Sequence, residues 1–87
     1  MKNSIHVPTY LRVINTVLQK GQRNEEGISD YEGISAWTEY DGYTCTLSNG
    51  KVTFTLFFHN KYEFDYKNSD DFDKFQKKIL QIDQLTN

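Results

Sequence analysis

The sequence predicts an α+β domain, a two-layer sandwich in which a helix, four antiparallel strands and a second helix follow one another. Apolar residues recur at three- and four-residue steps near both ends of the chain, and between them the apolar period falls to two. The central segment also contains Asp41-Gly42 and Asn49-Gly50, the dipeptides most favoured in two-residue hairpin turns. At 87 residues, the chain is expected to form one domain, 1–87, around one core.

The first helix is predicted at 8–20. Pro8 suits the first turn, where its missing N–H would have no partner inside the helix, and Gly21 suits a left-handed position after the last turn. The apolar side of this helix is expected to comprise Val7, Tyr10, Leu11, Ile14, Val17 and Leu18.

Residues 21–33 are expected to form an irregular loop, because they include three glycines and show no apolar period. Arg23 stands against four acidic residues, so the segment is net acidic. With few apolar anchors, it is also expected to be the region least protected from hydrogen exchange.

Four strands are predicted at 34–40, 43–48, 51–58 and 62–66, joined by loops at 41–42, 49–50 and 59–61. These loops place Cys45 opposite both Thr38 and Phe54. The register gathers the apolar alternate positions on one sheet face. That face is expected to comprise Ala36, Thr38, Tyr40, Tyr43, Cys45, Leu47, Val52, Phe54, Leu56, Phe58, Tyr62, Phe64 and Tyr66.

The second helix is predicted to begin after Asn68 or Ser69 as N-cap, with Asp70 and Asp71 in its first turn. Its apolar side comprises Phe72, Phe75, Ile79 and Ile82, with Leu80 or Leu85 at the margin. Both helices are expected to bury these sides against the one apolar sheet face. The edges of the sheet would then be the strands 34–40 and 62–66.

Composition excludes several classes of protein. A formal net charge of −2 argues against an electrostatic nucleic-acid binder. Cys45 is the only cysteine, so no intrachain disulfide can form, and a reducing compartment is favoured. The sequence shows neither a signal peptide nor an apolar run near the roughly 20 residues that span a membrane. We expect a cytoplasmic protein without membrane association.

Three groups of residues invite a chemical role, and each has a simpler interpretation. His59-Asn60 is reminiscent of His-Asn-His nucleases, but the sequence supplies too few metal ligands for that chemistry. The carboxylates at 70, 71 and 73 suit helix capping better than a cation site. Cys45 is expected to be a small buried apolar residue. We therefore expect no catalytic residue, metal or cofactor, and a protein that is not an enzyme.

Trp37 and Phe57 are the candidate interaction residues, because both fall on the other, Thr-rich sheet face. Either the 21–33 loop covers Trp37 through Ile28 or Tyr31, or the two aromatics form a patch for self-association or a protein partner. A base-stacking platform for single-stranded nucleic acid is the alternative, which neighbouring carboxylates disfavour.

The segments Asp41-Gly42-Tyr43-Thr44 and Phe57-Phe58-His59-Asn60-Lys61-Tyr62-Glu63-Phe64, with a C-terminal Phe-x-x-Phe helix, resemble a family of small uncharacterised bacterial proteins. The resemblance implies a bacterial cytoplasmic protein and transfers no site residue. We expect a non-catalytic interaction or accessory protein whose partner is another protein or, as a homodimer, a second copy. The alternative is a nucleic-acid or small-ligand binder that uses the same open face.

Overall fold

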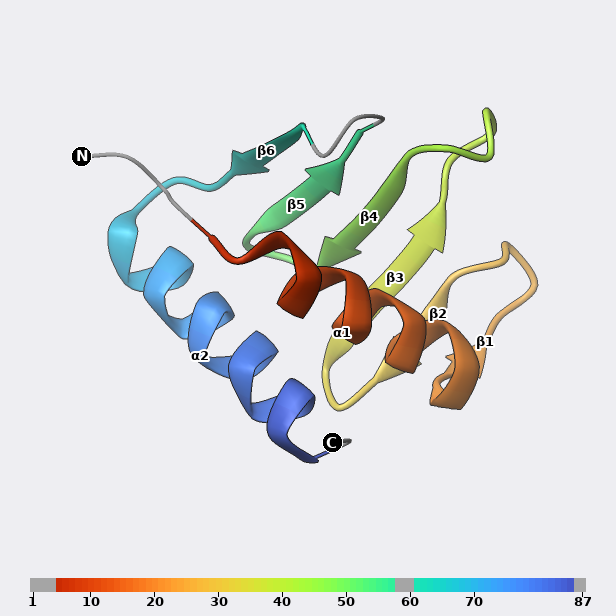
Figure 1. Cartoon of the computed structure of the whole chain (residues 1–87), viewed down its shortest axis with the longest axis horizontal. Helices are drawn as coiled ribbons and strands as arrows, with labels where there is room; N and C mark the ends of the chain where they lie inside the picture. The colour runs from red at the N-terminus through yellow and green to blue at the C-terminus, as the bar shows by residue number, and fades with distance from the viewer. Residues whose placement is uncertain (1–4, 58–60, 86–87) are drawn as a thin grey trace.

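The computed structural model describes residues 5–57 and 61–85 and confirms the α+β class (Figure 1). Its elements in chain order are α1 (Val7–Lys20), β1 (Gln22–Arg23), β2 (Ser29–Tyr31), β3 (Ile34–Thr38), β4 (Cys45–Ser48), β5 (Thr53–Leu56), β6 (Tyr62–Asp65) and α2 (Ser69–Leu85).

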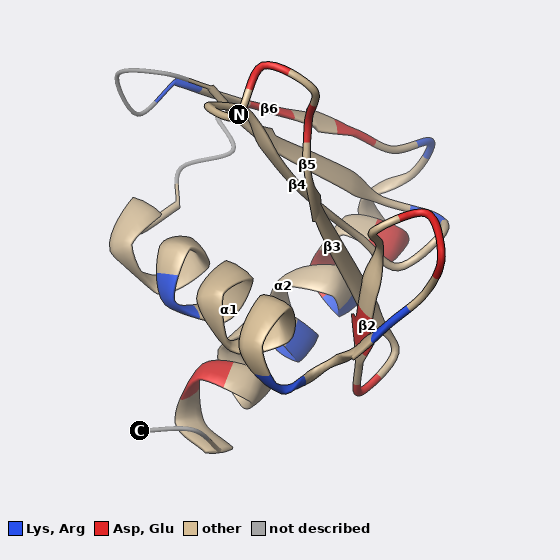
Figure 2. Ribbon diagram, turned by 90° about the vertical axis from the view of Figure 1, so that its right-hand side faces the viewer, with Lys and Arg blue, Asp and Glu red and all other residues tan. Residues whose placement is uncertain are grey.

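The six strands form one antiparallel meander in the order β1-β2-β3-β4-β5-β6. Both helices lie on the same face of this sheet, as predicted, and they also contact each other (Figures 1 and 2). Among the described residues, no helix lies on the second face. The two-layer prediction is confirmed, but the sheet has six strands where four were expected.

The prediction of an irregular loop at 21–33 is wrong, because two short strands form there. Asn24 closes the first hairpin by accepting hydrogen bonds at Oδ1 from the backbone N–H groups of Glu26 and Ile28, at 2.9 and 3.0 Å. The second turn has Glu32 and Gly33 at positive φ, 53° and 83°, which matches the right-handed twist of the flanking strands. As a result the edges are β1 and β6, and β3 is an interior strand.

Gly21 does not adopt the left-handed conformation predicted for it, since its φ is −73°. A Cβ at this position would lie 2.4 Å from the Val17 carbonyl oxygen and 2.7 Å from that of Asp30. The glycine is therefore needed because β2 passes close to the end of α1, and not because of backbone handedness.

The predicted pairing of β3 with β4 is confirmed, with Thr38 opposite Cys45. The hairpin is wider than predicted, because the carboxylate of Asp41 accepts hydrogen bonds from the backbone N–H groups of Tyr43 and Thr44 at 2.8 and 2.9 Å. The strands stop at Thr38 and Cys45, the Glu39 N–H still donates to the Thr44 carbonyl at 2.7 Å, and the chain leaves the sheet between these two residues. Tyr40 and Tyr43, predicted in the core, are instead 107% and 69% exposed.

The predicted register of the next two hairpins is wrong by two residues in each case. Cys45 lies opposite Leu56, and Phe54 lies opposite Leu47 and Phe64. In the first of these hairpins Asn49 precedes the turn and caps it through Oδ1, so the central pair is residues 50 and 51 rather than 49 and 50. The predicted third loop lies mostly outside the described residues, as do Phe58, His59 and Asn60.

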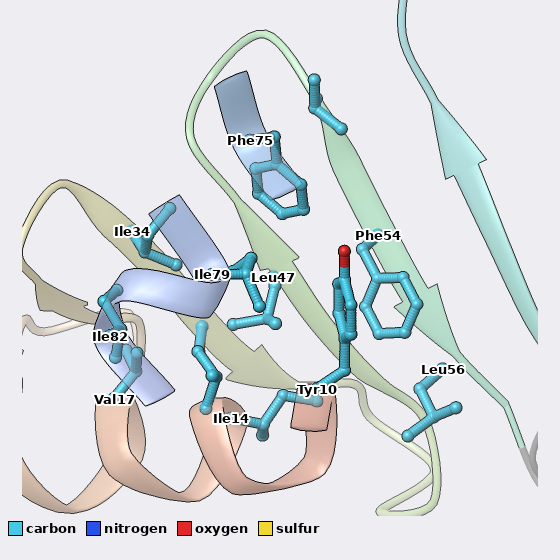
Figure 3. Close-up of a cluster of buried hydrophobic side chains, with 13 residues drawn as sticks. Tyr10, Ile14, Val17, Ile34, Leu47, Phe54, Leu56, Phe75, Ile79 and Ile82 are labelled. Atoms are coloured by element: carbon cyan, nitrogen blue, oxygen red, sulfur yellow. The ribbon is translucent and has the colours of Figure 1, made fainter. Parts of the chain in front are cut away.

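Because side chains alternate between faces, a shift of two residues leaves every side chain on its predicted face. The core therefore lies between the helices and the predicted sheet face (Figure 3). Its most deeply buried members are Val13, Val17, Ile34, Ala36, Leu47, Val52, Phe54, Phe75, Ile79 and Ile82.

The predicted core stripe of α2 is confirmed, and that of α1 is partly wrong. All four predicted α2 residues are buried. In α1, Leu11 is 39% exposed, and Val13, which was not predicted, is fully buried. Tyr10 stacks obliquely on Phe54 with ring centroids 4.6 Å apart, which fixes the rotation of α1 on the sheet.

Candidate functional site

The sheet face that carries no helix, called the open face below, is built from two complete side-chain rows and part of a third. One row runs across all six strands as Gln22, Asp30, Ser35, Ser48, Thr53 and Asp65. The next row runs as Trp37, Thr46, Thr55 and Glu63. The third contains Glu39, Thr44 and Phe57, one alternate position further along their strands.

Trp37 is held in place on this face by a carboxylate. Its indole Nε1–H donates to Glu39 Oε2 at 2.8 Å, and the hydroxyl of Thr46 donates to the same oxygen at 2.9 Å. Thr46 is only 2% exposed, although no helix covers it. The indole and its carboxylate partner thus form an ordered, partly exposed cluster on the open face.

The β1–β2 hairpin lies beside Trp37. This is close to the arrangement in which residues 21–33 cover the indole, one of the two interpretations of the sequence. Ile28 and Trp37 line one hollow of about 390 Å³, together with Arg23 and Gly27. Trp37 nevertheless stays partly exposed. The hairpin therefore borders the indole and leaves part of it accessible.

Phe57 follows β5, two strands across from Trp37 and one row further along the open face, and is 36% exposed. It lines a hollow of about 510 Å³ with Asp41, Tyr43 and Thr44, all from the β3–β4 hairpin. The two aromatic residues predicted from the sequence therefore belong to different hollows, one beside β1–β2 and one beside the β3–β4 hairpin. Sequence reasoning missed Tyr43 because an ideal two-residue turn would have pointed it into the core.

The charge of the open face is predominantly negative. Its rows contain Asp30, Glu39, Glu63 and Asp65 together with the cation Lys61 opposite Phe57, and Asp41 lies beside them in the β3–β4 hairpin. Asp30 also accepts a hydrogen bond from the hydroxyl of Ser35. The surface combines carboxylates, hydroxyls and aromatic rings.

Hydrogen bonds keep the Asp41 carboxylate ionised. The backbone N–H groups of Thr44 and Tyr43, followed by the hydroxyl of Thr44, lower the pKa of this exposed group. Its negative charge therefore persists into acidic solution, beside the exposed ring of Tyr43.

A third hollow, of about 200 Å³, lies between the helices and is lined by Tyr10, Gln76 and Leu80 among others. The Tyr10 hydroxyl is buried without a well-formed hydrogen bond among the described residues. Burial raises the pKa of Tyr10 to about 12, an effect that the nearby Gln76 side chain partly offsets. The atom is shielded from solvent, so we assign it to the core.

The pairing of Arg12 with Asp83 joins α1 to α2 across 71 residues of sequence. Arg12 donates from Nε and Nη2 to the two carboxylate oxygens at 2.8 and 3.0 Å. Those hydrogen bonds lower the pKa of Asp83, whose side chain is mostly buried. Arg12 lies on the exposed side of its helix, and a sequence pattern could not identify a partner so distant in the chain.

The remaining sequence candidates lie apart from the open face. Cys45 is half-buried at the edge of the core. Asp70 and Asp71 lie in the first turn of α2, where the Asn68 carboxamide caps the N–H of Asp71 at 2.9 Å. Across residues 5–57 and 61–85, no three His, Cys, Asp or Glu side chains are arranged to hold a metal ion. Within the same ranges, neither helix has the length and apolarity that crossing a membrane requires.

Comparison with known proteins identifies one family. The family model described as a protein of unknown function, DUF3081, matches residues 5–87, which is nearly the whole chain. No curated protein and no solved structure gives a match. The chain therefore belongs to the DUF3081 family of proteins of unknown function.

Proposed function

We propose that this domain is a non-catalytic interaction protein that binds a basic segment of a protein partner through its open face. The observation that supports this most is the placement of Trp37 and Phe57 among carboxylates on the one sheet face that no helix covers. A solvated strand position does not require an aromatic side chain. Aromatic anchors are, in contrast, typical of interface centres.

The charge of the face supports a cationic occupant. The carboxylates of Asp30, Glu63 and Asp65 are exposed, and the last two lie on the edge strand β6 at the ends of their rows. Lysine and arginine side chains would complement them, because opposite potentials favour encounter and orientation. The same carboxylates would repel the phosphates of a nucleic acid, which was the alternative from sequence. A single cysteine favours a cytoplasmic setting for this interaction.

The proposal is tested by titrating the isotopically labelled protein with a short lysine- and arginine-rich peptide and following backbone amide shifts. A glutamate-rich peptide and a single-stranded oligonucleotide serve as opposite-charge controls. We expect the basic peptide alone to shift resonances, and the shifts to map to β3, β4, β5 and β6 on the open face.

A matched pair of charge reversals separates a local surface from a general charge effect. Glu63→Lys changes an exposed residue of the open face, and Asp73→Lys makes the same change in net charge on exposed α2. Binding should weaken in the first variant and persist in the second.

Equal weakening in both variants, shifts confined to the helices, or binding of the oligonucleotide would overturn the proposal. Amide shifts that depend on protein concentration without peptide would identify a second copy of the chain as the occupant, and would overturn it as well.

A further inference from the structure

The hollow beside the β3–β4 hairpin combines the groups that recognise an organic cation. Two aromatic rings, Tyr43 and Phe57, line it together with the carboxylate of Asp41 and with Thr44. The rings come from different parts of the chain, one from the hairpin and one from the end of β5. Both stay accessible, at 69% and 36% exposure.

The hairpin holds this arrangement through its own hydrogen bonds. Asp41 Oδ1 accepts from two backbone N–H groups and Oδ2 accepts from the Thr44 hydroxyl at 2.9 Å. The Thr44 carbonyl in turn accepts from the Glu39 N–H at 2.7 Å. The carboxylate is therefore fixed in position and remains negatively charged beside the aromatic rings.

We propose that this hollow receives the cationic head of a lysine or arginine side chain from the partner segment, an inference that rests on the proposed function. The faces of aromatic rings attract cations through their quadrupole. The nearby carboxylate adds a Coulombic attraction that a neutral side chain would not experience. A volume of about 510 Å³ accommodates such a head with its methylene stem.

Charge around the hollow agrees with this occupant. Glu39 lies in the same row as Thr44 and Phe57, so a second carboxylate is close. Lys61 is the described cation nearest in register, since its carbonyl accepts a hydrogen bond from the Phe57 N–H at 2.6 Å. Lys61 is exposed and does not line the hollow. Removal of the Lys61 charge should therefore strengthen the binding of an external cation in the hollow.

The test uses two probes that share one backbone and methylene stem: Nα-acetyl-lysine methylamide, which is cationic, and its Nε-acetylated form, which is neutral and larger by one acetyl group. Proton NMR follows the lysine ε-methylene resonance. We expect an upfield ring-current shift for the cationic probe with the wild-type protein, and none for the neutral probe.

Two tyrosines of the same hairpin provide matched variants. Tyr43→Ala removes a ring that lines the hollow, and Tyr40→Ala removes an exposed ring that does not. Tyr43→Ala should abolish the ring-current shift and weaken binding of the basic peptide about two- to fivefold, the range for an exposed cation–π contact. Tyr40→Ala should change neither the ring-current shift nor peptide binding. Lys61→Ala should increase the ring-current shift and strengthen peptide binding.

The outcomes separate this inference from the proposed function. If the basic peptide binds the open face but Tyr43→Ala behaves like Tyr40→Ala, the hollow is not the cation site and the proposed function stands. If the cationic probe binds in the hollow while the peptide does not bind, the inference stands and the proposed function fails. Equal shifts for the charged and neutral probes would overturn the inference.

Discussion

Substitution of Phe54 by alanine tests whether the core lies where the register places it. Phe54 is fully buried on β5, and its ring lies 4.6 Å from that of Tyr10 and 5.1 Å from that of Phe64. Removing it takes away contacts with both α1 and β6. The neighbouring side chains come from different elements, so they cannot close the cavity by a single rotamer change.

The expected cost is about 3–5 kcal/mol, the range for truncation of a buried phenylalanine. A domain of this length has a total stability of roughly 4–13 kcal/mol at the usual range per residue. The substitution should therefore lower the melting temperature by about 12 °C or more, given about 4–8 °C per kcal/mol.

Phe57→Ala is the matched control, because Phe57 follows β5 closely and lies on the open face, where it is 36% exposed. Its cost should stay below that of Phe54→Ala, because the Phe57 side chain is already 36% exposed to solvent and leaves a smaller buried cavity. Urea denaturation of both variants, monitored by circular dichroism, gives the comparison. A cost below about 1 kcal/mol for Phe54→Ala, or a larger cost for Phe57→Ala, would refute the assignment of faces.

Three further predictions follow from the structure. Arg12 lowers the pKa of Asp83, so that carboxylate stabilises the fold above its unfolded pKa of about 3.9 and stops doing so as pH falls through the lower folded value. Acidification below about pH 4 should therefore cost the wild type more thermal stability than Asp83→Asn, and identical slopes would contradict this. Gly21→Ala should destabilise more than Gly33→Ala. At Gly21 the Cβ would lie 2.4 and 2.7 Å from backbone oxygens, whereas at Gly33 the Cβ meets open space and only the positive φ adds strain; chemical denaturation compares the pair. Amide exchange should be slower at residues 29 and 30, which are paired on both sides, than in the turn before them, and uniform exchange would argue against the six-stranded sheet.

The candidate site could be predicted only in part. The alternation of apolar and polar residues assigned Trp37 and Phe57 to the open face, and that assignment survives the two-residue register errors. Tyr43 was missed because Asp41 widens the turn through side-chain hydrogen bonds to its own backbone. Dipeptide preferences describe the backbone angles of a turn. The width of this turn depends instead on the hydrogen bonds that the Asp41 carboxylate accepts from the backbone, which the preferences do not describe.

The sequence by itself determined the fold class, the helices, and which face of the central strands is apolar, because these depend on local periodicity. Tertiary structure decided the rest. Residues 22–31 form strands because β3 offers them an edge to pair with, and short polar segments have no such preference alone. The register of β5 and the pairing of Arg12 with Asp83 likewise depend on how the whole chain packs, since long-range contacts select among arrangements that are equivalent in local pattern.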